Sequence, residues 1–127
     1  PKKQSFCDVI KILDKILSKI LKNNFIFVFT DPKIKNNKNF LLDQKLYKNN
    51  INKYVKSFKE IVKTPFNLNL EKNFFSKDYH QDIFFYVYST KSKKILAQGG
   101  GYRYYKNKKE IEGFGFSCNV DNLADLI

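Results

Sequence analysis

The second half of the chain consists of short apolar segments separated by polar residues, and this pattern restricts the possible folds more than any other feature. Residues 66–71, 82–90, 94–100 and 113–120 are rich in the aromatic and β-branched side chains that favour strands. The polar run Lys91–Lys94 lies between two of these segments and has the composition of a turn. Because strands joined by short turns pair antiparallel, the sequence predicts an antiparallel sheet.

The first half has helical spacing. In residues 5–22, apolar side chains recur every three or four positions, and Ser5 is a candidate cap for this helix. Residues 51–63 repeat the spacing, and Asp121 is a candidate cap for a last helix over 121–127. Residues 25–30 form an apolar run that predicts a buried strand. Residues 33–50 show no sustained period, so they predict a connection with a short helical turn at 40–42.

These elements place the chain in the α+β class, as an antiparallel β-sheet flanked by helices. The length of 127 residues fits one domain over residues 1–127. Pro1 in place of an initiator Met also fits a processed chain or an excised piece of a longer domain.

The net charge of +12 is carried by 23 lysines and one arginine, with few acidic residues to balance them. Lys, Asn, Ile, Phe and Tyr are the residues that AT-rich codons encode, so a genomic bias explains the excess. Nucleic-acid sites usually rely on the planar fork of Arg, and these lysines are scattered along the chain. We therefore interpret the charge as a solvated surface and expect no nucleic-acid partner. No apolar run is long enough to span a membrane and no secretory leader is evident, which predicts a cytoplasmic protein.

Residues 95–105 contain the run Gly99-Gly100-Gly101. No Lys-Ser or Lys-Thr pair follows it, so it is not a Walker loop. A dinucleotide fingerprint needs a helix directly after its glycines, and the Tyr- and Lys-rich residues that follow do not predict one. Because glycine has no Cβ, the run can let the backbone approach a ligand or another strand, and the sequence leaves both possibilities open.

Recognisable catalytic and metal-binding patterns are missing from the sequence. His80, the single histidine, is bracketed by Asp78 and Asp82, which is compatible with an acid–base cluster but favours a solvated strand edge. Cys7 on a helix and Cys118 in an apolar strand are interpreted as inert thiols, with no disulfide. We expect no cofactor and no metal.

Three blocks of the second half resemble the C-terminal part of the catalytic domain in histidyl-tRNA synthetases. They equally resemble the paralogue of those enzymes, the regulatory subunit of short-form ATP phosphoribosyltransferase. Asp78-Tyr79-His80 stands where the family has Asp-Tyr-Tyr, and Gly99–Tyr102 stands at its Gly-Gly-Arg-Tyr. Gly115–Leu123 stands at its Gly-Phe-Ala-Ile-Gly-Leu-Glu-Arg-Leu. The N-terminal helix and strand resemble the segment that follows the second motif of the family, while residues 31–50 are too short for the insertion that synthetases carry there.

The resemblance implies a class II aminoacyl-tRNA synthetase-like fold, truncated, with a pocket for a histidine-like ligand. Carried over by position, the pocket residues are Tyr79, His80, Gly99, Gly100, Tyr102 and Gly115. The family's arginines, which a synthetase needs to hold ATP phosphates and the activated carboxylate, are replaced by Phe75, Gly101 and Asn122. The resemblance therefore implies that the chain is not an enzyme.

The function implied is that of a non-catalytic regulatory subunit. It would bind the short catalytic subunit of ATP phosphoribosyltransferase as an oligomer and support the first step of histidine biosynthesis and its feedback by histidine. Two alternatives stay open: a degenerate or partial histidyl-tRNA synthetase catalytic domain that binds histidine and tRNA, and a stand-alone binding module.

Overall fold

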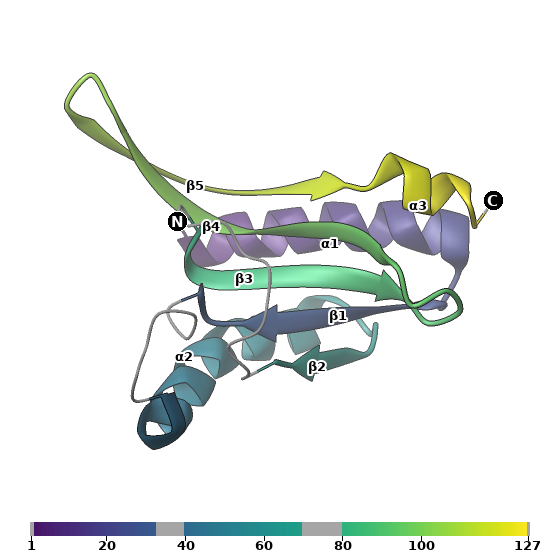
Figure 1. Cartoon of the computed structure of the whole chain (residues 1–127), viewed down its shortest axis with the longest axis horizontal. Helices are drawn as coiled ribbons and strands as arrows, with labels where there is room; N and C mark the ends of the chain where they lie inside the picture. Colours follow the sequence, from purple (N-terminus) through teal and green to yellow (C-terminus); the bar gives the residue numbers. More distant parts are fainter. Residues whose placement is uncertain (1, 33–39, 70–79, 127) are drawn as a thin grey trace.

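The computed structural model describes residues 2–32, 40–69 and 80–126. The elements, in chain order, are α1 (Lys2–Leu21), β1 (Phe25–Thr30), α2 (Phe40–Ile61), β2 (Phe66–Leu68), β3 (His80–Ser89), β4 (Ile95–Lys106), β5 (Lys109–Cys118) and α3 (Val120–Ala124). The strands form one five-stranded sheet in the order β2-β1-β3-β4-β5 (Figure 1). The α+β class predicted from the sequence is confirmed.

The sheet is mixed, which corrects the prediction of a wholly antiparallel one. The pairs β1–β3, β3–β4 and β4–β5 are antiparallel, whereas β1 and β2 run parallel. Helix α2 connects β1 to β2 and brings the chain back to the end of the sheet at which β1 begins. A helical crossover of this kind joins parallel strands, while a tight hairpin cannot.

One face of the sheet packs on α1 and α2 through a core of phenylalanines. Figure 1 looks onto the other face, with α1 behind β4 and next to β5. Phe27 and Phe29 of β1 meet Phe58 of α2 with both ring centroids 5.1 Å away, and Phe6 of α1 lies 5.9 Å from Phe29. Phe85 of β3 completes the cluster, and all five side chains are buried. Burial of each ring contributes roughly 1.5–3 kcal/mol to stability, so these contacts fix the helices on this face.

Three element boundaries differ from the sequence expectation. Helix α1 starts at Lys2, so Ser5 lies inside it and is not its cap. Residues 40–50, predicted as a connection, are the first half of α2. Asn119, and not Asp121, caps α3, because its Oδ1 accepts a hydrogen bond from the Asn122 backbone N–H at 3.0 Å.

The residues that follow the glycine run are strand, not loop. Strand β4 continues to Lys106 and β5 starts at Lys109, so only two residues join them. Both of these, Asn107 and Lys108, have positive φ angles of 53° and 66°, the geometry of the tight turns that suit twisted hairpins. The tip of the β4–β5 hairpin extends beyond the body of the molecule (Figure 1).

None of the helices in the described ranges is long and apolar enough to cross a membrane.

Candidate functional site

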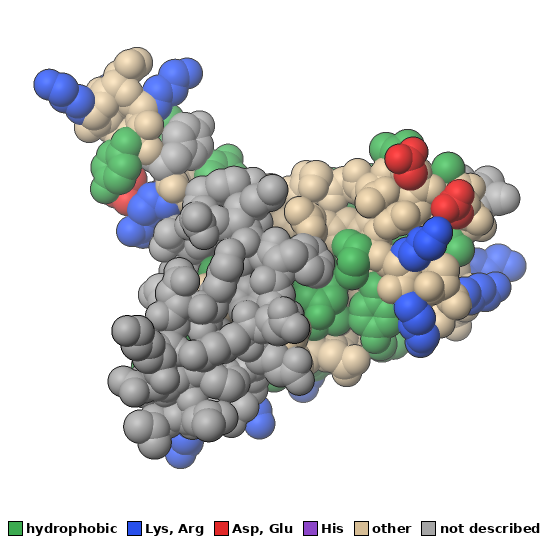
Figure 2. All heavy atoms as spheres, viewed as in Figure 1, with side chains coloured by type: hydrophobic (Ala, Val, Ile, Leu, Met, Phe, Trp, Pro, Cys, Tyr) green, Lys and Arg blue, Asp and Glu red, His purple; other side chains and the backbone are tan. Residues whose placement is uncertain are grey.

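On the face of the sheet opposite α1 and α2, residue positions form rows across the strands. Directly paired residues of an antiparallel sheet share a face, so the register gives these rows. One row runs Thr30–Phe84–Gly100–Gly115 from β1 to β5. On one side of it lies His80–Tyr102–Gly113, and on the other Val28–Tyr86–Gln98–Ser117. We call this surface, which is opposite α1 and α2, the open face; Thr30, Phe84 and Gly100 in its middle row are nevertheless buried, and Gly115 is half-buried. Figure 2 shows apolar side chains gathered on the part of it that is not covered by grey atoms.

The structure brings four of the predicted pocket residues together on the open face. His80, Gly100, Tyr102 and Gly115 come from separate segments of the sequence and occupy neighbouring positions on β3, β4 and β5. Tyr79 lies outside the described residues, as do Asp78 and Phe75. His80 is the first residue of β3, and a register shift between Gln81 and Phe84 follows it.

Gly99 and Gly101 face the helices and not the open face. Gly99 pairs with Phe116 and Phe85, and Gly101 pairs with Phe114, so each glycine lies opposite a large ring. Phe114 packs on Phe85 with ring centroids 6.2 Å apart and planes at 11°. The absence of side chains at these two glycines leaves core volume for the rings.

Gly100 allows two strands to approach closely. A Cβ built on Gly100 would lie 2.3 Å from the carbonyl oxygen of Ile83 and 3.1 Å from the Cα of Phe84, both backbone atoms of β3. This contact coincides with the register shift in β3. Of the two possibilities left open by the sequence, the structure thus supports approach to another strand at Gly99 and Gly100.

The space available for a side chain differs between Gly113 and Gly115. The ring of Tyr102 lies across Gly113, because a Cβ there would be 2.2 Å from the Tyr102 hydroxyl. Among the described residues, a Cβ at Gly115 would meet only Cε1 of Tyr102, at an ordinary 3.8 Å. As far as the described residues go, the side-chain space at Gly115 is therefore free apart from one aromatic ring on one side.

Polar side chains lie elsewhere on the open face, from β5 across to β1. Tyr86 accepts a hydrogen bond from the side-chain amide of Asn69 at 3.3 Å, and Gln98 and Ser117 lie in the same row, half-buried and exposed. Thr30 is fully buried, and within the part of the chain that the structure describes its hydroxyl oxygen has no hydrogen-bond partner. A buried hydroxyl without a partner costs about 1–3 kcal/mol. It shares its row with Gly100 and Gly115.

The arginine of the hairpin is paired with two of its glutamates. Arg103, the single arginine of the chain, contacts Glu110 through Nε and Glu112 through Nη2, both at 2.7 Å. Asn122, which stands at the position of a family arginine, donates from its side chain to the carbonyl oxygen of Ile95 at 2.6 Å and so fastens α3 to β4. Neither side chain presents a charge-bearing donor to the open face.

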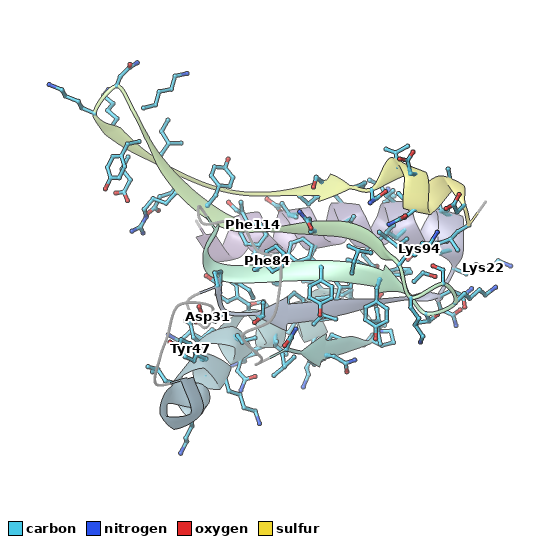
Figure 3. All side chains as sticks on the ribbon, viewed as in Figure 1. Lys22, Asp31, Tyr47, Phe84, Lys94 and Phe114 are labelled. Carbon is cyan, nitrogen blue, oxygen red and sulfur yellow. The ribbon has the colours of Figure 1, made fainter. Side chains whose placement is uncertain are left out.

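A buried polar pair at the end of β1 was missed by sequence reasoning. Asp31 is 1% exposed and its Oδ2 accepts a hydrogen bond from Asn50 of α2 at 2.8 Å. Figure 3 labels Asp31 and Tyr47, which precedes Asn50 by one helical turn on the same side of α2. Asp31 directly follows the strand predicted over residues 25–30, and no local signal reveals a hydrogen bond to a residue 19 positions away.

The thiol of Cys118 lies at the end of β5, beside a hollow of about 200 Å³ that Gln98, Ser117 and Asn119 also line. Burial raises the pKa of this thiol above its ordinary value. Both cysteines are free, and the described residues contain no group of His, Cys, Asp and Glu side chains that could hold a metal ion.

We expect Cys118 to react with iodoacetamide more slowly than an unfolded thiol, and its rate to keep rising above the pH at which an ordinary thiol is fully ionised. Because the folded pKa is raised, the protonated thiol contributes stability that is present below the unfolded pKa and lost as pH rises through the folded pKa. The measurement is alkylation followed by mass spectrometry across alkaline pH in a Cys7→Ser chain. The urea-unfolded chain is the control, and coincident titration in the two states would contradict the expectation.

No family model and no curated protein matches the chain. The class that the fold and the site define is an α+β domain with a mixed sheet, helices on one face, and a glycine- and tyrosine-lined opposite face.

Proposed function

We propose that the chain is a non-catalytic regulatory subunit of short-form ATP phosphoribosyltransferase that binds histidine on the open face. The observation that carries the proposal is the meeting of His80, Gly100, Tyr102 and Gly115 on three adjacent strands. These residues belong to the separate sequence blocks that resemble the histidyl-tRNA synthetase family. Their convergence is what a shared amino-acid pocket requires.

The side chains near Gly115 suit a ligand with an aromatic ring and polar ends. The free space over Gly115 is bounded by the Tyr102 ring, against which an imidazole can stack. The side chains of Gln98 and Ser117, on β4 and β5 beside Gly115, can bond the polar ends of such a ligand.

The charge distribution supports a binding role without catalysis. Activation of histidine with ATP creates negative charge that preorganised cations must stabilise. Arg103 is held between Glu110 and Glu112, and Gly101 and Asn122 stand where the family has arginines. Histidine bound here would not be activated with ATP. Its binding would instead regulate the catalytic subunit.

Titration calorimetry with histidine tests the pocket. The wild-type chain is expected to bind histidine, and Gly115→Val to weaken binding by about tenfold or more because the new side chain fills the open space. Tyr105→Ala, at a side chain that is 74% exposed on the hairpin, is the control and should bind like the wild type. If the Gly115→Val and wild-type chains bind histidine with equal affinity, the open face is not the histidine site.

Two further assays test the partner and the lack of activity. A pull-down with the purified short catalytic subunit should retain the wild-type chain, and ATP–pyrophosphate exchange with histidine should give no turnover. If neither histidine nor the catalytic subunit binds, the proposal fails. Measurable exchange would instead favour a degenerate histidyl-tRNA synthetase.

A further inference from the structure

Helix α1 carries a second apolar row that the core does not use. Its core-facing side chains are fully or almost fully buried: Phe6, Ile10, Leu13, Leu17 and Leu21. On the outer surface, Ile12, Ile16 and Ile20 remain 52%, 40% and 39% exposed. The spacing of four residues places them in one continuous row about 12 Å long. Single exposed apolar residues are ordinary, but three in a row on one helix indicate a contact surface.

The isoleucine row lies away from α2. Asp14, which projects from a different side of α1, accepts a hydrogen bond from the hydroxyl of Thr64 just after α2. At about 100° per residue, the isoleucines are directed well away from that side of the helix. Helix α2 therefore cannot cover the row without leaving its own contacts with the sheet.

A row of lysines accompanies the isoleucines. Lys11, Lys15 and Lys19 are exposed, precede the three isoleucines by one residue each, and have no carboxylate partner among the described residues. Asp8 is the nearby carboxylate of this surface, and it accepts a hydrogen bond from Gln4 at 2.9 Å. The surface is thus an apolar ridge with unpaired positive charge along one side.

We propose that this surface of α1 is a docking site for an acidic amphipathic helix of a partner protein. The i, i+4 isoleucine ridge fits between the side chains of a second helix, and a line of Glu or Asp beside the partner's apolar residues would pair with the lysines. Charge complementarity decides against a second copy of this chain, which would bring the same three lysines and no row of carboxylates. An anionic lipid surface is less suitable, because the broad apolar side of α1 is already buried in the core and a narrow ridge remains. The inference does not depend on histidine binding.

The test uses two synthetic helical peptides of about 20 residues. Both carry leucine at i, i+4 spacing, one flanked by glutamate and the other by lysine at the same positions. Fluorescence anisotropy with the full chain should show binding of the acidic peptide and none of the basic one. Ile16→Ser should weaken binding by about tenfold, and Lys15→Glu/Lys19→Glu should lose the acidic peptide and gain the basic one.

Leu46→Ser on α2, at another exposed apolar side chain, is the matched control and should leave binding unchanged. Circular dichroism checks that each variant is folded, which their exposure leads us to expect. The proposal is overturned if the acidic peptide fails to bind at millimolar concentration, if both peptides bind alike, or if the isoleucine and lysine variants bind normally. Ile16-dependent binding to phosphatidylserine vesicles without peptide binding, or Ile16-dependent dimerisation in sedimentation, would equally overturn it.

Discussion

Replacing Gly99 by alanine is expected to lower the free energy of unfolding by about 2–4 kcal/mol, although the change adds a single methyl group. A Cβ at this position would lie 2.2 Å from the carbonyl oxygen of Gly115 and 2.9 Å from the Cα of Phe116. Both are backbone atoms of β5, so the clash cannot be relieved by rotating a side chain. The two strands must move apart, and the packing of Phe116 and Phe85 against this position is lost with them. Urea denaturation followed by circular dichroism measures the loss.

Gly100→Ala should have a comparable effect through the other neighbour of β4, because its Cβ would lie 2.3 Å from the Ile83 carbonyl oxygen in β3. Gly115→Ala is the matched control in the same hairpin. Its Cβ would make one ordinary contact with Tyr102, so we expect a change within about 1 kcal/mol. A Gly99→Ala chain as stable as the Gly115→Ala chain would show that the close approach of β4 and β5 is not what the glycine run provides.

For the glycine run, the sequence predicts which phosphate-binding loops are absent but not which side of the sheet each glycine faces. The absence of a following helix and of a Lys-Ser pair was enough to reject the two phosphate-binding loops. The choice between a ligand and a strand as the close neighbour depended on the register of β3, β4 and β5. Register is set by partners far away in the sequence, and a shift of one residue exchanges the two faces of a strand. The sequence could therefore place the glycines in the sheet without assigning each one to a face.

Helix prediction succeeded where one side of the helix is strongly apolar and failed where it is not. The N-terminal helix has a complete buried stripe, and its existence follows from the spacing of those residues. The first half of α2 is rich in Lys and Asn, and of Lys45–Asn49 only Tyr47 is buried. With one core contact in this stretch there is no apolar period to detect, so the helix was recognised only from residue 51.

The hairpin and the parallel strand were missed for different reasons. The β4–β5 turn places Asn107 and Lys108 at positive φ without a glycine, so the usual Asn-Gly signal is absent. Strand β2 has three residues, and its parallel pairing with β1 depends on the crossover through α2, whose length was underestimated. Neither error changes the class of the fold, because the apolar runs over 25–30 and 82–90 still predict strands and the spacing over 5–22 and 51–63 still predicts helices.

The second large effect is expected from the centre of the phenylalanine core. Phe29 is fully buried and has five aromatic neighbours, in α1, β1, α2, β2 and β3, with ring centroids 5.1–6.3 Å away. Because it is the side chain through which both helices and the sheet meet, its truncation leaves a cavity that no single element can close. Phe29→Ala should lower the free energy of unfolding by about 3–5 kcal/mol, a large share of the total for a domain of this size.

The graded variant Phe29→Leu keeps most of the volume and should cost less than half as much, roughly 1–2 kcal/mol, so the effect remains measurable even if the alanine chain does not fold. Tyr105→Ala removes an aromatic ring that is 74% exposed and should change stability by less than about 0.5 kcal/mol. Guanidinium denaturation of the three chains at one temperature gives the comparison. If Phe29→Ala and Tyr105→Ala unfold at the same denaturant concentration, the two helices are not held to the sheet through Phe29, and the layer arrangement that creates the open face must have another basis.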